Sequence, residues 1–275
     1  MKPRPFDYVR PETADEAVAV LAEHGDEARI LAGGQSLMAM LNLRLADPAV
    51  LIDISRISEL DTISDLGDTI EIGAAVTQNR LLAWPHLAAK LPLLAAALPF
   101  VGHFQTRNRG TVCGSIAHAD PSSEIPLTLA VLEGEVVLRS ARGTRRLAAS
   151  AFQQTMLTTA RTADELIIAV RFPVLSGRGV AFREVARRHG DFAIVAVAAL
   201  VENANTVRFG VGGMSGRPEV RRIAPDGASA VAAAISQLTA EFEGYDDLHA
   251  SARMRSDLLR NLGPVVIEEA IRCTA

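Results

Sequence analysis

The feature that most constrains this chain is a pair of adjacent glycines, Gly33 and Gly34, between an apolar stretch and a helical pattern. Residues 29–41 read Arg-Ile-Leu-Ala-Gly-Gly-Gln-Ser-Leu-Met-Ala-Met-Leu, which predicts a short buried strand, a turn and a helix. Two glycines permit positive φ and leave no Cβ between the main chain and a ligand. We expect Ser36 to cap the helix, whose free N–H groups favour an anion such as phosphate. The alternative is an ordinary tight turn that binds nothing.

A second glycine-containing segment lies much later in the chain. Residues 109–126 read Arg-Gly-Thr-Val-Cys-Gly-Ser-Ile-Ala-His-Ala-Asp-Pro-Ser-Ser-Glu-Ile-Pro, with glycines beside small hydroxyl residues ahead of an Asp-Pro turn. Two backbone-lined loops far apart in sequence can each hold one phosphate of a pyrophosphate. The three-glycine spacing of the Rossmann fingerprint and the Gly-Lys-Ser/Thr of a P-loop are both absent. The pair therefore predicts a dinucleotide site of another kind.

Taken together, the two motifs resemble those of the FAD-binding medium subunits of molybdenum hydroxylases. They read Ala-Gly-Gly-Gln-Ser-Leu at 32–37 and Gly-Thr-Val-Cys-Gly-Ser-Ile-Ala-His-Ala-Asp-Pro at 110–121. Carbon monoxide dehydrogenase and bacterial xanthine dehydrogenase-type enzymes have such subunits. The resemblance covers nearly the whole chain and implies an α+β fold. Residues 1–176 would form the two-subdomain FAD-binding domain shared with vanillyl-alcohol oxidase and p-cresol methylhydroxylase. Residues 177–275 would form a small three-stranded antiparallel sheet plus helices.

Local patterns give the elements of this fold. Thr13 and Glu16 form a capping box, and Gly25 ends the helix that they begin. The tail is expected to be helical from residue 228, with an interruption at 263–264, and residues 251–255 resemble the segment that opens the family's last helices. Further elements are a hairpin turning at 66–68, a helix near 124–132, a strand at 165–172, and an antiparallel meander of strands at 180–187, 193–201 and 207–212.

Composition excludes several classes of function. The 275 residues are 49% hydrophobic, enough for two domains, and the net charge of −4 argues against nucleic acid and anionic membranes. The two cysteines, Cys113 and Cys273, form no CxxC motif, so neither a metal site nor a disulfide framework is expected. Residues 1–8 contain no signal segment, and no apolar run approaches the length of a membrane span. We therefore expect a cytoplasmic protein.

By resemblance, two groups of residues bind the FAD pyrophosphate through backbone N–H groups. Cys113 departs from the family, which usually has glycine there. It is either a redox thiol or a small buried residue, and the lack of a nearby resolving cysteine favours the second reading. The first group is Ala32, Gly33, Gly34, Gln35, Ser36 and Leu37, and the second is Thr111, Val112, Cys113, Gly114 and Ser115.

Five further residues complete the expected cofactor site. Glu124 matches an acidic residue that binds the adenosine end of FAD, although a carboxylate at a helix N-terminus is also favoured by the macrodipole. His118, in the shared Ala-His-Ala-Asp-Pro segment, is assigned to the cofactor and not to acid–base catalysis. Ile167 is expected to pack on the flavin nucleotide or in the strand core. Arg183, near a position that is often lysine, would stabilise the reduced flavin, and Phe192 would lie beside its ring.

The resemblance also implies the partners. A large subunit would hold the molybdenum cofactor and a small subunit two [2Fe–2S] clusters, in a dimer of heterotrimers. This chain would bind FAD non-covalently, take electrons from the clusters and pass them to an external acceptor, with no catalytic or metal-binding residue of its own. The alternatives are a self-contained FAD-dependent oxidase or dehydrogenase, and a scaffold subunit that has lost its flavin.

Overall fold

The computed structural model describes residues 1–175 and 177–274. Its N-terminal segment forms a parallel sheet in the order β1-β3-β2, because the helix α1 (Ala14–His24) connects two strands that run in the same direction. The Thr13 side chain accepts a hydrogen bond from the backbone N–H of Glu16, and Gly25 ends α1 with φ 51°, so the predicted helix is confirmed. The strands are β1 (Asp7–Val9), β2 (Ala28–Leu31) and β3 (Val50–Asp53).

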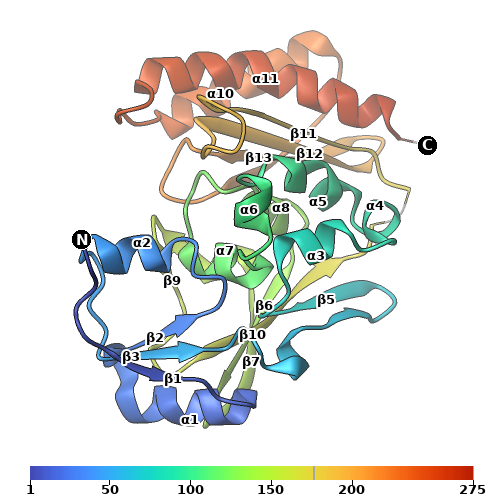
Figure 1. Cartoon of the computed structure of the whole chain (residues 1–275). Coiled ribbons are helices and arrows are strands. Elements are labelled where there is room, and N and C mark those ends of the chain that lie inside the picture. The colour runs from blue at the N-terminus through green and yellow to red at the C-terminus, as the bar shows by residue number, and fades with distance from the viewer. Residues whose placement is uncertain (176, 275) are drawn as a thin grey trace.

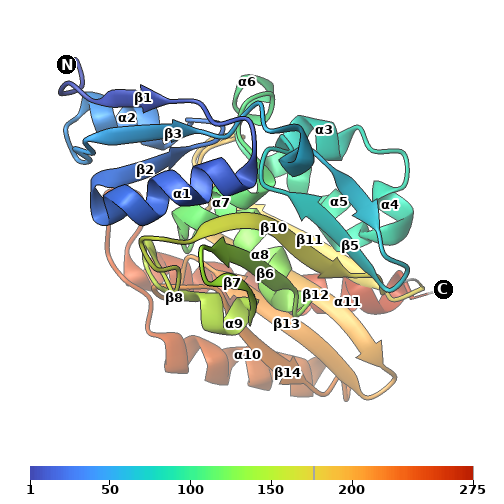
Figure 2. The ribbon, with the colours of Figure 1, turned by 90° about the horizontal axis from the view of Figure 1, so that it is seen from below.

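A five-stranded antiparallel sheet follows, in the order β4-β5-β10-β6-β7. The predicted hairpin at 66–68 is confirmed, since β4 pairs with β5 across that turn. α1 contacts β2, β3, β6 and β10, and therefore lies between the parallel sheet and this one (Figure 2). The strands are β4 (Ile63–Asp65), β5 (Thr69–Gly73), β6 (Glu135–Ser140), β7 (Gly143–Ala148) and β10 (Leu166–Pro173), with a separate pair, β8 (Gln153–Thr155) and β9 (Thr158–Thr159).

Short helices fill the middle of the molecule, between the five-stranded sheet and the C-terminal layers (Figure 1). Among them, α8 is buried along almost its whole length, because it contacts other elements on several sides. Its first residue, Glu124, is thereby held in the interior. The short α-helices of residues 1–175 as a whole are α2 (Leu37–Asn42), α3 (Gln78–Leu82), α4 (Leu87–Lys90), α5 (Pro92–Ala97), α6 (Phe104–Arg107), α7 (Val112–His118), α8 (Glu124–Val131) and α9 (Ala149–Phe152).

The C-terminal sheet is antiparallel, in the order β11-β12-β13-β14. The long helices cover one of its faces (Figure 1), and α5 and α8 pack on the other. Because both faces are covered, residues 195–201 of β12 form an uninterrupted buried apolar run. The elements are β11 (Val180–Val185), β12 (Val195–Asn203), β13 (Thr206–Gly212), β14 (Glu219–Ile223), α10 (Ala228–Phe242) and α11 (Ala252–Arg272).

This sheet has a fourth strand in addition to the three expected. β14 is an edge strand whose five residues include three charged ones, so it carries no apolar signal. Its arginines are satisfied by ion pairs, Arg221 with Glu219 at 3.1 Å and Arg222 with Glu202 at 2.8 Å. Its pairing with β13, and not its own composition, makes it a strand.

The expected interruption of the last helix is wrong. α11 continues through Pro264, which removes only one backbone hydrogen bond, while Val266 and Ile267 beyond it are buried. Packing therefore overrides the local propensity of Gly263 and Pro264. The predicted domain boundary at 176/177 stays a prediction, because Ser176 lies outside the described residues. No helix within residues 1–175 and 177–274 is both long and apolar enough to span a bilayer.

Candidate functional site

The two glycine segments line one cavity of about 740 Å³. This volume lies within the range of small-molecule and cofactor sites, roughly 300–1,000 Å³. The structure thus brings together segments that are far apart in sequence, as the paired motifs predicted. The expected site residues that line this cleft are Ala32, Gly33, Gly34, Gln35, Ser36, Leu37, Thr111, Cys113, Gly114, Ser115, His118, Glu124, Ile167 and Phe192.

Gly33 is the point where the two segments touch. A Cβ built on Gly33 would lie 2.1 Å from the carbonyl oxygen of Arg109 and 2.7 Å from the Cα of Gly110, both main-chain atoms. Gly34 has φ 70°, a conformation that side-chain-bearing residues rarely adopt. The adjacent glycines therefore serve two purposes: one permits close approach and the other permits the turn.

The first segment presents unpaired donors to the cleft. Among the described residues, the backbone N–H groups of 34–37 have no hydrogen-bond acceptor, and the first helical bond runs from Met38 to the carbonyl of Gly34 at 3.0 Å. The expectation that the Ser36 side chain caps α2 is wrong. Ser36 already has helical φ and ψ of −88° and −45°, and its hydroxyl accepts no capping bond. That hydroxyl is consequently available to a ligand.

The second segment is a helix start and not the expected loop. The Thr111 side chain caps α7 by accepting a hydrogen bond from the Gly114 N–H at 2.9 Å. The N–H of Val112 bonds the carbonyl of Val76 at 3.1 Å, which ties the helix start to the neighbouring segment. Val112 itself is fully buried and does not line the cleft, unlike the other residues expected in this segment.

Cys113 has the surroundings of an inert thiol. Its side chain is 3% exposed, and its Sγ lies 3.5 Å from the carbonyl oxygen of Ile72. Burial raises the pKa of this thiol far above its ordinary value, so the nucleophilic thiolate is disfavoured. It lies inside α7 and does not have the positive φ that would favour glycine. The structure therefore favours the small buried residue over the redox thiol.

Replacing Cys113 with glycine should leave FAD affinity within about twofold, because the thiol makes its contacts with the core. The free energy of unfolding should fall by about 1–3 kcal/mol, since glycine weakens a helix and leaves a small void. Fluorescence titration with FAD and urea unfolding measure the two effects. A large gain in affinity would contradict this account and mean that Cys113 weakens the cleft.

Two carboxyl groups that influence each other lie on α8 and on β11: Glu124 is buried, and Glu184 is half-buried. Glu124 lines the cleft and is 3% exposed, and burial raises its pKa to about 7. Burial likewise raises the pKa of Glu184 to about 8, with the Glu124 carboxylate adding to the effect. The Glu184 Oε2 is buried without a hydrogen-bond partner among the described residues. A protonated Glu184 avoids an uncompensated charge in this position.

This burial makes stability depend on pH. Unfolded Glu184 ionises near its ordinary pKa, whereas the folded protein keeps it protonated up to about pH 8. Its contribution is thus fully present at acidic pH and is lost as pH rises through the folded pKa. Glu184→Gln should therefore stabilise the protein by about 1–3 kcal/mol at pH 8.5, and by much less at pH 4.5. Thermal unfolding across this pH range measures the difference. Glu268→Gln, at an exposed position, is the control, and its effect on stability should hardly change with pH.

Arg183 does not reach the cleft, which corrects its expected place beside the flavin. Alternation along β11 turns Arg183 toward α11, where its Nε lies 2.8 Å from the Glu269 carboxylate. Phe182 and Glu184 face the opposite way, with the Phe182 ring 5.5 Å from that of Phe100. A difference of one residue in strand register therefore exchanges a cation for a carboxyl group on the inner face.

The cleft also contains residues that sequence patterns did not indicate. Arg29 and Arg161 line it, as do Gln78 and Thr106. Isolated arginines belong to no motif, and their distance in sequence hides the fact that they share one cavity. The only available signal for Arg29 was its place in the strand that leads to Gly33.

Comparisons with known proteins identify the family of this chain. The family model described as the FAD binding domain in molybdopterin dehydrogenase matches residues 4–175. The chain is 43% identical to the caffeine dehydrogenase subunit beta of a Pseudomonas species, over 73% of this chain and 69% of that protein. It is 34% identical to the 6-hydroxypseudooxynicotine dehydrogenase complex subunit alpha of Paenarthrobacter nicotinovorans, over 98% of this chain and 96% of that protein.

Solved structures extend the likeness to the whole fold. A chain of carbon monoxide dehydrogenase from Hydrogenophaga pseudoflava superposes with a TM-score of 0.93 at 32% identity, over 100% of both chains. A chain of quinoline 2-oxidoreductase from Pseudomonas putida superposes with a TM-score of 0.92 at 32% identity, also over 100% of both chains. The fold prediction is thereby confirmed. The chain belongs to the family of medium, FAD-binding subunits of molybdenum-containing dehydrogenases.

Proposed function

We propose that this chain holds FAD in the 740 Å³ cleft, receives electrons from [2Fe–2S] clusters of a small partner subunit and delivers them to an external acceptor. Substrate oxidation would take place at the molybdenum cofactor of a large subunit, in a dimer of heterotrimers. Bound FAD would supply a group that accepts and releases electrons singly or in pairs. The observation that carries the proposal is the meeting of both glycine segments at one cleft.

The residues present fit a dinucleotide. The unpaired N–H groups of 34–37 and the Ser36 hydroxyl are donors suited to phosphate oxygens. At Glu124, no side chain among those described donates to the buried carboxyl group, which is therefore free to accept from a ribose hydroxyl. Ile167 offers an apolar wall, and Phe192, which is 56% exposed, stands at the mouth.

The names of the relatives support this division of labour. Two of them are called medium chains of carbon monoxide dehydrogenase and another the medium subunit of nicotine 6-hydroxylase, names that imply further subunits. We propose the same arrangement here, with the 1–176 segment binding FAD and the 177–275 segment closing the cleft. Their substrates differ, so the substrate of this complex is set by its large subunit.

A visible absorption spectrum of the protein purified from its native source tests the proposal. We expect flavin bands that pass into the supernatant on acid precipitation, together with iron–sulfur absorbance from co-purifying chains. Flavin on an isolated chain that oxidises substrate unaided would favour the self-contained oxidase instead. A protein that takes up no flavin even when soaked with FAD would contradict the proposal.

A further inference from the structure

The positive charge inside the cleft comes from two side chains. Among the described residues that line it, Arg29 and Arg161 are the only lysine or arginine residues, and the acidic ones are Asp26, Glu124, Glu165 and Asp191. Each guanidinium is permanently charged, whereas burial favours the neutral form of Glu124. The net charge of the cleft therefore depends on whether the carboxylates of Asp26, Glu165 and Asp191 point into it.

Arg161 is a partly buried cation with backbone partners only. Its Nη1 donates to the carbonyl oxygens of Thr162 at 3.0 Å, Ala163 at 3.5 Å and Glu165 at 2.8 Å. Its Nε and Nη2 have no acceptor, and no carboxylate lies within 4.0 Å of the guanidinium, among the residues described. Burial lowers the pKa of Arg161, and Arg29 lowers it further, whereas Glu165, Asp26 and Asp164 raise it.

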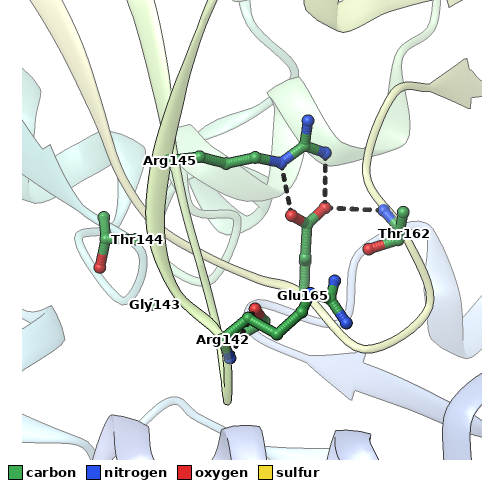
Figure 3. A pocket seen from close by; sticks show the side chains of 7 residues that line it. Arg142, Gly143, Thr144, Arg145, Thr162 and Glu165 are labelled. Carbon is green, nitrogen blue, oxygen red and sulfur yellow. Dashed lines mark hydrogen bonds and ion pairs between the residues drawn. The ribbon is translucent and has the colours of Figure 1, made fainter.

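Glu165, four residues after Arg161, directs its carboxylate elsewhere. Glu165 lines both the cleft and a second cavity of about 370 Å³, which Arg142, Arg145 and Thr162 also line. In that cavity the Glu165 carboxylate accepts two hydrogen bonds from Arg145, at 2.5 and 2.8 Å (Figure 3). It accepts a third from the Thr162 N–H at 2.8 Å. Asp164 is likewise paired with Arg142, at 2.6 Å. The carboxylates of this loop are thus occupied outside the cleft.

We propose that Arg161, assisted by Arg29, is the cationic partner of the FAD diphosphate. This inference rests on the proposed binding of FAD in the cleft. A diphosphate carries negative charges that backbone N–H groups alone do not neutralise, and two guanidinium groups match them. The bonds from Nη1 to three carbonyls hold the Arg161 side chain in place and leave its remaining N–H donors for phosphate oxygens. Arg161 is thereby a binding residue that selects the dinucleotide over uncharged flavin.

Titrations of the full-length apoprotein test this inference. Arg161→Gln should weaken FAD binding by about 10-fold or more, and the Arg29→Gln, Arg161→Gln double variant should weaken it further. Riboflavin, which has no phosphate, should bind all variants within about twofold of the wild type. Inorganic pyrophosphate should raise the melting temperature of the wild type and not that of Arg161→Gln. Arg142→Gln removes one charge from the same region outside the cleft and is the matched control.

The outcomes separate the two hypotheses. If the wild type binds FAD and Arg161→Gln binds it equally well, the arginine only braces its loop, and the inference is overturned while the proposed function stands. If pyrophosphate binds in an Arg161-dependent manner but FAD does not bind, the anion subsite stands and the proposed function fails. If neither FAD nor pyrophosphate binds the wild type, both are overturned.

Discussion

Replacing Gly33 with alanine is expected to remove FAD from the protein while most of the fold persists. The new Cβ would lie 2.1 Å from the Arg109 carbonyl oxygen and 2.7 Å from its carbon, so one of the two segments must move away. Main-chain atoms cannot turn aside as a flexible side chain can. The movement would shift the N–H groups of 34–37 from the second segment. We expect FAD affinity to fall by at least about 100-fold, on the order of 3 kcal/mol.

The neighbouring glycine provides the matched comparison. Gly34→Ala would introduce strain of about 1–2 kcal/mol through its φ of 70°, but its new Cβ would meet only the side chains of Leu31 and Met38, at 3.1 and 3.3 Å. Its effect on affinity should therefore be clearly smaller. Fluorescence titration with FAD ranks the variants, and circular dichroism confirms their folds. Equal affinities for Gly33→Ala and Gly34→Ala would show that close approach of the segments is unimportant.

Sequence predicted best those features that depend on local backbone chemistry. The helix from 14 to 24 had a capping threonine at one end and Gly25 at the other, and both act as expected. The glycine pair at 33–34 likewise predicted a turn, and this prediction does not depend on the tertiary contacts of the turn. These signals lie within a few residues of the feature that they specify, so no tertiary information was needed.

Features that depend on packing could not be predicted from the sequence. β14 has no apolar pattern and exists because β13 offers it a partner, while α11 passes Pro264 because its buried face holds it against the sheet. In the site, the choice between Arg183 and Glu184 depended on a single step of strand register. Arg161 belongs to no sequence motif. Its proposed role depends on the carboxylates of Asp164 and Glu165 pairing with other arginines, which the sequence does not show.

Replacing Arg255 with methionine is expected to destabilise the protein by about 3–5 kcal/mol, because breaking a buried charged network leaves its partners unsatisfied. The side chain is 2% exposed. It donates to the carbonyl oxygens of Ile194, of Gly213 at 2.9 Å and of Tyr245 at 3.1 Å, and it pairs with Asp247. One residue thus joins the start of α11 to the residue before β12, to the residue after β13 and to the loop before the helix.

Urea unfolding measures this loss, and Arg253→Met is the matched control. Arg253 is two residues earlier on the same helix, and its side chain is 92% exposed, so its replacement should change stability by less than about 0.5 kcal/mol. A loss below about 1 kcal/mol for Arg255→Met would mean that water replaces the arginine at these carbonyls. The effect should also reach the cleft, because Ile194 follows Phe192 by two residues. Weaker FAD retention at temperatures well below the unfolding transition would connect this buried arginine to the mouth of the site.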